Sequence, residues 1–121
     1  MKYTAITLYG IANCDSVKKA RTWLTEQGFE HVFHDFKKQG LPEKKLHHWL
    51  QQAGWETVLN RKGTSWRKLS LAEQSSVTSA ATALPFILAN PSLVKRPVIE
   101  WQSNESVEMT VGYQPDQWFV R

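Results

Sequence analysis

The sequence contains one cysteine, Cys14, in 121 residues. A single cysteine excludes an intramolecular disulfide and a zinc site built from several thiolates. No apolar run approaches the ~18 residues that would cross a bilayer, and residues 1–4 lead directly into a strand-like segment rather than a signal peptide. We therefore expect a protein of the cytoplasm that has no membrane span, because a free thiol persists in a reducing compartment.

The chain also lacks a cluster of basic residues, although its formal net charge is +4. Lys and Arg are scattered and do not form the runs of about five or more like charges that are typical of nucleic-acid-binding segments. The positive charge therefore predicts a small anionic ligand and no nucleic acid. Hydrophobic residues make up 41% of the chain, enough for one packed core, and most of the six tryptophans are expected inside it.

The chain begins with a strand, a helix and a second strand. Residues 5–9 are rich in β-forming side chains and are followed by Gly10, which favours a short buried strand. A helix is predicted from residues 14–16 to Gly28, and residues 32–36 form the next strand. This order predicts a parallel βαβ unit with a right-handed crossover.

Residues 42–91 have the apolar spacing of helices. One helix is expected to begin at Pro42 and to end at Gly54. Residues 70–90 are mostly helical in pattern, and Pro85 is expected to kink or end a helix there.

The last part of the chain returns to strands. Residues 97–101 and 107–111 predict a hairpin with a turn at 103–104, and residues 115–119 predict a final short helix. A βαβ unit followed by two strands and a helix is the order of the thioredoxin fold.

We therefore predict one α/β domain over residues 1–121, with a thioredoxin-like mixed sheet. Its core is expected to consist of residues 1–41 and 92–121, and residues 42–91 are expected to form an all-helical insertion.

Cys14 lies at the predicted junction between the first strand and the first helix. Unpaired N–H groups and the positive end of the helix dipole stabilise an anion there, so the thiolate is favoured. Lys18 and Lys19 add positive charge one turn further on, whereas Asp15 opposes it. A lone cysteine is often only a small buried apolar residue, but this position favours a nucleophile.

Residues 14–17 carry Val17 where a dithiol redox motif has its second cysteine. Any disulfide of this chain therefore joins Cys14 to another molecule, such as glutathione or a protein partner, and an external thiol must resolve it. Nothing in the sequence pairs Asp35 with Glu100 as an acid–base site, and no metal site is expected.

Three segments of the chain resemble the ArsC/Spx family of arsenate reductase-like proteins, and within it the YffB-type branch. They are residues 9–20, 60–61 and 93–99. The resemblance covers essentially the whole chain, in order and in spacing. It implies a thioredoxin fold with a helical insertion, with Cys14 as the catalytic thiol and Pro97 in the cis form facing it.

By the same resemblance, Arg61 and Arg96 match two arginines that bind the oxyanion in the arsenate reductases. A planar guanidinium fork suits an oxyanion and a glutathione carboxylate equally well. We expect Asn13 and Lys18, which lie beside the thiol, to complete the substrate-binding set with Pro97.

The sequence departs from the arsenate reductases at three places. Their third oxyanion-binding arginine falls within residues 107–111, which contain no arginine; acidic Asp15 follows the cysteine; and Gly10 stands where they have a histidine. These differences favour glutathione-linked disulfides over arsenate as the substrate.

We therefore predict a glutathione-dependent monothiol reductase whose Cys14 forms a mixed disulfide. No cofactor is expected to stay bound; glutathione is the co-substrate, glutaredoxin or a protein disulfide is a further partner, and the chain is expected to be a monomer. Two alternatives are a glutaredoxin-linked arsenate reductase and an Spx-like redox-responsive regulator that binds RNA polymerase without catalysis. Spx-type sensing pairs two cysteines, so Val17 favours the enzyme.

Overall fold

The computed structural model describes residues 3–119, which form two compact units. The first unit contains the residues up to Gln39 and those from Arg96 onward, and the second contains Gly40–Lys95. The chain thus leaves the first unit after Gln39 and returns to it at Arg96, one residue before Pro97. Cys14 and Arg96 belong to the first unit, whereas Arg61 belongs to the second.

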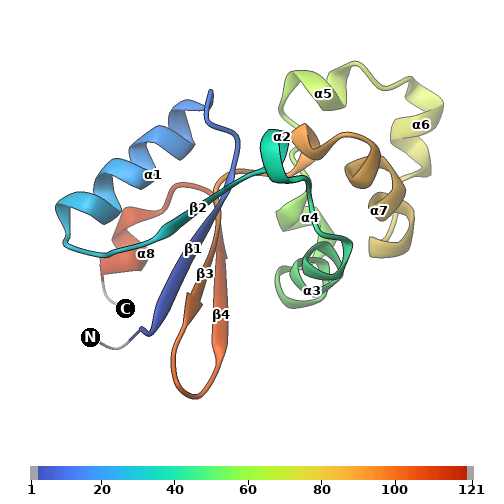
Figure 1. Ribbon diagram of the computed structural model, residues 1–121. Helices are drawn as coiled ribbons and strands as arrows, with labels where there is room; N and C mark the ends of the chain where they lie inside the picture. The colour runs from blue at the N-terminus through green and yellow to red at the C-terminus, as the bar shows by residue number, and fades with distance from the viewer. Residues whose placement is uncertain (1–2, 120–121) are drawn as a thin grey trace. The chain divides into compact units, whose positions relative to one another are not determined.

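The first unit is built on a four-stranded mixed sheet within the described residues (Figure 1). Its strands are β1 (Ala5–Gly10), β2 (Val32–Asp35), β3 (Val98–Gln102) and β4 (Val107–Val111), in the order β2-β1-β3-β4. β1 runs parallel to β2 and antiparallel to β3, and β4 is antiparallel to β3. The predicted α/β fold, a βαβ unit followed by a hairpin and a helix, is confirmed.

Two helices, α1 (Asp15–Glu26) and α8 (Pro115–Phe119), pack on one face of this sheet (Figure 1). The apolar residues of α1 recur at helical spacing, so that Val17, Ala20 and Leu24 all face the strands and are fully buried. This stripe fixes the position of α1 against the sheet, and with it the position of the first turn of the helix.

Two tryptophans occupy the core beneath these helices. Trp101 on β3 and Trp118 on α8 are almost completely buried, and both indole N–H groups donate to the hydroxyl of Thr110, at 3.0 and 3.2 Å. A third tryptophan, Trp49, is fully buried in the second unit. These side chains combine a large apolar area with a hydrogen-bond donor that must be satisfied when it is buried.

The second predicted strand is one residue shorter than expected. Phe36 begins the short helix α2 (Phe36–Gln39), and β2 ends at Asp35. The Asp35 carboxylate accepts a hydrogen bond from the N–H of Lys37 at 2.9 Å, which is the contact an N-cap residue makes. The Asp35 cap therefore ends β2 one residue before the apolar pattern of the sequence ends at Phe36.

The regular secondary structure of residues 40–95, the second unit, is helical apart from one isolated antiparallel bridge between Leu59 and Val94. The helices are α3 (Glu43–Ala53), α4 (Trp55–Val58), α5 (Thr64–Arg67), α6 (Leu71–Ser76) and α7 (Ala80–Ala89), followed by a 3-10 turn at Pro91–Leu93. Across residues 3–119, no helix is long and apolar enough to cross a membrane.

Pro85, which was expected to kink or end a helix, does not end one. Pro85 lies inside α7, and the break between helices falls at residues 77–79. The Ser79 side chain accepts a hydrogen bond from the N–H of Thr82, and the Thr82 hydroxyl oxygen accepts one from the N–H of Ser79 in return. This capping box satisfies two otherwise free N–H groups and fixes the start of α7. Pro85 then removes one backbone donor without ending the helix.

Candidate active site

Cys14 occupies the N-cap position of α1, at the end of the loop that follows β1. Its backbone is extended, with φ −143° and ψ 123°, and its carbonyl accepts a hydrogen bond from the N–H of Lys18 at 2.9 Å. The thiol side chain is half-buried, and Asn13 just before it is exposed. The thiol therefore lies at the positive end of a 12-residue helix.

The surroundings of Cys14 favour its ionised form. Partial burial acts to raise the pKa of the Cys14 thiol, but the backbone N–H of Val17, the Arg96 guanidinium and the N–H of Ser16 together outweigh it. The pKa consequently lies below the ordinary value of a cysteine. Backbone donors at a helix N-terminus and a nearby cation are the two features that generate a thiolate in proteins.

The arginine beside the sulfur is held by the sheet. Arg96 is half-buried and directly precedes Pro97, and the peptide bond between them is cis, as the family resemblance implies. The Pro97 carbonyl accepts a hydrogen bond from the N–H of Gly112 at 2.8 Å, which ties the start of β3 to the end of β4. The backbone next to Arg96 is therefore part of the sheet framework rather than of a free loop.

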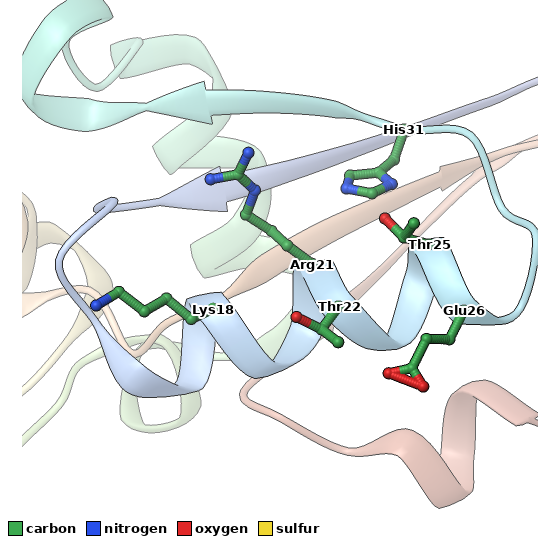
Figure 2. Close-up of a pocket in the computed structure, with 6 residues that line it drawn as sticks. All are labelled: Lys18, Arg21, Thr22, Thr25, Glu26 and His31. Atoms are coloured by element: carbon green, nitrogen blue, oxygen red, sulfur yellow. The ribbon is translucent and has the colours of Figure 1, made fainter.

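A shallow depression of about 540 Å³ runs along the exposed side of α1 (Figure 2). Lys18 lies at one end of it and Glu26 at the other, with Arg21 and His31 between them. The Arg21 guanidinium lies 4.3 Å above the centre of the Phe33 ring, a cation–π contact that holds it on this surface. Lys18 and Arg21 thus make the half of the depression nearest Cys14 positively charged.

Arg61 belongs to the second unit, and its side chain is exposed. Its guanidinium lies 5.5 Å from the centre of the Trp55 ring and 3.5 Å from a carboxylate oxygen of Glu56. The role at the thiol that the resemblance implies for Arg61 stays a prediction.

The structure contains a buried polar pair, Tyr9 and Glu100, that no sequence pattern predicted. The Tyr9 hydroxyl donates to a carboxylate oxygen of Glu100 at 2.9 Å, and both side chains are buried. Burial and then the adjacent Glu100 charge raise the pKa of Tyr9 above its usual range. The available signal was an acidic residue inside the apolar strand 98–101. Asp35, in contrast, caps α2, so Asp35 and Glu100 have separate structural roles.

The chemistry of this site centres on the Cys14 thiol. Among residues 3–119, no three His, Cys, Asp or Glu side chains converge closely enough to hold a metal ion. The groups that surround the sulfur are hydrogen-bond donors and cations, which are suited to a thiolate, a carboxylate or an oxyanion.

The fold and the site define a thioredoxin-like protein with one cysteine at the N-terminus of its first helix. The chain belongs to the ArsC family, whose family model matches residues 9–119. The family resemblance noted from residues 9–20, 60–61 and 93–99 is therefore confirmed.

Relatives cover most of the chain. A protein of uncharacterised function from Haemophilus influenzae is 43% identical over 94 residues, which make up 78% of this chain and 82% of the relative. The solved structure of the YFFB (PA3664) protein is 41% identical, with a TM-score of 0.86 over 96% of this chain and 97% of that one. An arsenate reductase (ArsC) related protein from Brucella melitensis is 42% identical, with a TM-score of 0.73 over 97% and 93% of the two chains.

A regulator is also similar to this chain. The global transcriptional regulator Spx of Streptococcus pneumoniae is 28% identical over 114 residues, which make up 93% of this chain and 81% of the regulator. The chain is thus an arsenate reductase-like protein whose relatives include a transcriptional regulator. The choice between a catalytic and a regulatory role rests on the site itself.

Proposed function

We propose that this chain is a glutathione-dependent monothiol reductase of disulfides that acts as a monomer in the cytoplasm, with Cys14 as the nucleophile. The observation that carries the proposal is the position of Cys14 at the start of α1 beside the Arg96 guanidinium, where the thiol pKa is lowered. Only the thiolate attacks a disulfide, so a lowered pKa increases the reactive fraction at neutral pH.

The reaction proceeds in two thiol–disulfide exchanges. In the first, the Cys14 thiolate attacks the glutathione sulfur of a disulfide between glutathione and another thiol. A new S–S bond joins Cys14 to glutathione, the old S–S bond breaks, and the departing thiolate of the other thiol takes a proton from water. In the second, the thiolate of a free glutathione attacks the glutathione sulfur of this mixed disulfide. Oxidised glutathione leaves, and Cys14 returns to its thiolate form.

Charged and backbone groups around the sulfur are proposed to bind the glutathionyl part of the substrate. Arg96 and Lys18 supply positive charge for its carboxylates, and the exposed side chain of Asn13 supplies a donor and an acceptor. Pro97 presents the backbone next to Arg96 to the substrate. Arg61 is proposed as a further carboxylate ligand on the ground of the family resemblance alone.

Arsenate reduction linked to glutaredoxin is the less supported alternative within the same class. Asp15, the first residue of α1, is exposed next to Cys14, and its carboxylate repels a compact oxyanion. Residues 107–111, where the arsenate reductases place a third arginine by resemblance, contain none. A glutathione disulfide spreads its charge over carboxylates distant from the reacting sulfur, so the same acidic residue affects it less.

A regulatory role is the second candidate, and the similarity to Spx favours it. Spx-type sensing typically pairs two cysteines, and this chain carries Val17 at the second position of the motif, with its side chain fully buried. A single thiol can report oxidation only by joining an external thiol. A chain of that kind is better suited to exchange with glutathione than to an internal redox switch.

The test combines trapping with turnover. Treatment with oxidised glutathione is expected to add one glutathione to the wild-type chain and none to Cys14→Ser, as read by intact-protein mass spectrometry. Reduction of a small glutathione mixed disulfide, coupled to glutathione reductase, is expected to require Cys14 and free glutathione. Trapping without turnover would contradict the enzyme and support the regulator, whereas turnover of arsenate alone would support the alternative substrate.

A further inference from the structure

Gly10, the last residue of β1, lies in direct contact with the first turn of α1. A Cβ atom placed on Gly10 would lie 2.6 Å from Cγ2 of Val17 and 3.6 Å from its Cγ1. The shorter distance is well inside the contact range of two carbon atoms. Gly10 is not among the glycines with a positive φ. Glycine is therefore needed at this position because a side chain would not fit, and not because of the backbone conformation.

The Val17 side chain is packed within the core. It is fully buried and belongs to the core cluster that α1 forms with β1 and β3, which includes Leu8 and Ile99. A β-branched side chain in a helix is restricted to essentially one rotamer, and close-packed interiors do not absorb an added methyl group without displacement. A side chain at position 10 would therefore displace the start of α1, β1 itself, or both.

The first turn of α1 also carries the backbone N–H groups that face the Cys14 thiol. Val17 is the third residue of the helix, and its own backbone N–H is the largest of the contributions that favour the Cys14 thiolate. The N–H of Ser16, one residue earlier, acts in the same direction. The side chain of Val17 therefore fixes a backbone donor whose distance to the sulfur decides its strength.

We propose that Gly10 is a positioning residue for the Cys14 thiolate: by leaving the space at the end of β1 empty, it lets Val17 seat the first turn of α1 with its N–H groups toward the sulfur. This inference rests on the proposed nucleophilic role of Cys14. It adds that the reactivity of the thiol depends on the packing of the Val17 side chain against Gly10, on the side of α1 that faces the sheet.

The experiment compares the rate of Cys14 alkylation by iodoacetamide as a function of pH in four proteins. They are the wild type, Gly10→Ala, the double variant Gly10→Ala/Val17→Ala, and Ile6→Val. In the double variant the new Cβ occupies space that the removed methyl groups leave. Ile6→Val is the matched control, because it makes a small change in the same strand and the same core cluster at the end away from Cys14.

Gly10→Ala is expected to move the inflection of the alkylation profile upward by about half a pH unit or more, as a weakened backbone donor requires. The double variant is expected to recover most of that shift, and Ile6→Val is expected to match the wild type. A merely destabilising effect would lower the melting temperature in Gly10→Ala without moving the inflection. Should Gly10→Ala not fold, the double variant carries the test through its own inflection, which is expected near the wild-type value.

Three outcomes separate this inference from the function it rests on. An ordinary inflection already in the wild type would contradict the proposed function itself. A low inflection in the wild type that is unchanged in Gly10→Ala, or one that shifts in Gly10→Ala and stays shifted in the double variant, would overturn the positioning role and leave the function standing.

Discussion

The guanidinium of Arg96 interacts with the sulfur of Cys14, although the two residues lie far apart in the sequence. Cys14 follows β1, and Arg96 leads into β3. β1 and β3 are antiparallel neighbours in the sheet, with Tyr9 opposite Val98, so the end of one strand meets the beginning of the other. The pairing of β1 with β3 therefore brings Arg96 to Cys14. Cys14 and Arg96 can each be substituted separately.

Removal of the Arg96 charge is expected to raise the pKa of Cys14. Arg96→Ala deletes both the hydrogen bond and the charge that lower it, and Arg96→Lys keeps only the charge. The inflection of the alkylation profile is expected to rise most in Arg96→Ala, by about one unit or less, and by an intermediate amount in Arg96→Lys. The exposed Arg67→Ala is the control; an equal shift there would show a general charge effect.

The stability of the protein is expected to depend on pH through Cys14. Because its pKa is lower in the folded state than in the unfolded chain, the unfolded state binds more protons between the two values, and folding gains stability as the pH rises. The gain is complete above the unfolded pKa of about 8.5. Urea unfolding of the wild type and Cys14→Ala should therefore diverge as the pH rises toward that value. A constant difference between the two proteins would contradict the lowered pKa.

Lys18 is expected to bind substrate more than it tunes the thiol. Its side chain lines the depression beside the start of α1 (Figure 2). Lys18→Gln should raise KM for a glutathione mixed disulfide by roughly two- to fivefold, as expected for an exposed charge contact, with kcat and the alkylation profile nearly unchanged. Lys44→Gln, an exposed lysine of α3 in the second unit, is the control. A fall in kcat with constant KM would assign Lys18 to the chemical step instead.

The Tyr9–Glu100 pair is expected to stabilise the fold without affecting the thiol. Tyr9→Phe removes a hydrogen bond to a buried carboxylate and should lower the free energy of unfolding by about 1–2 kcal/mol. Glu100→Gln keeps an acceptor for the tyrosine and should be milder. The alkylation profile of Cys14 is the second readout, and a shift in Tyr9→Phe would connect this pair to the site.

Much of the fold could be predicted because its elements carry local signals. The apolar stripe of α1 and the position of Gly28 predicted that helix, and two strand-like segments joined by a turn at residues 103–104 predicted the hairpin. Pro85 lies within α7 rather than at its end, because an internal proline removes one backbone donor and the rest of the helix continues. The helix begins where Ser79 forms a capping box with Thr82. A side-chain cap likewise sets the end of β2, because the Asp35 carboxylate accepts a hydrogen bond from the backbone at the start of α2.

The site was predictable at Cys14 and less so around it. The thiol and its helix are neighbours in sequence, so a strand-to-helix junction was enough to locate them. Arg96 required the family resemblance, because sheet pairing rather than spacing brings it to the sulfur. The contact between Gly10 and Val17 and the Tyr9–Glu100 hydrogen bond depend on packing distances that a residue pattern does not contain.

The central claim is that Cys14 is a thiolate nucleophile at neutral pH, and its alkylation profile tests this most directly. The rate of carboxamidomethylation of the folded wild type is measured from acidic to alkaline pH, with the urea-unfolded chain as the internal reference. We expect an inflection in the folded protein clearly below that of the unfolded chain, which should lie at about 8.5. An inflection of the folded protein at or above that of the unfolded chain would contradict it.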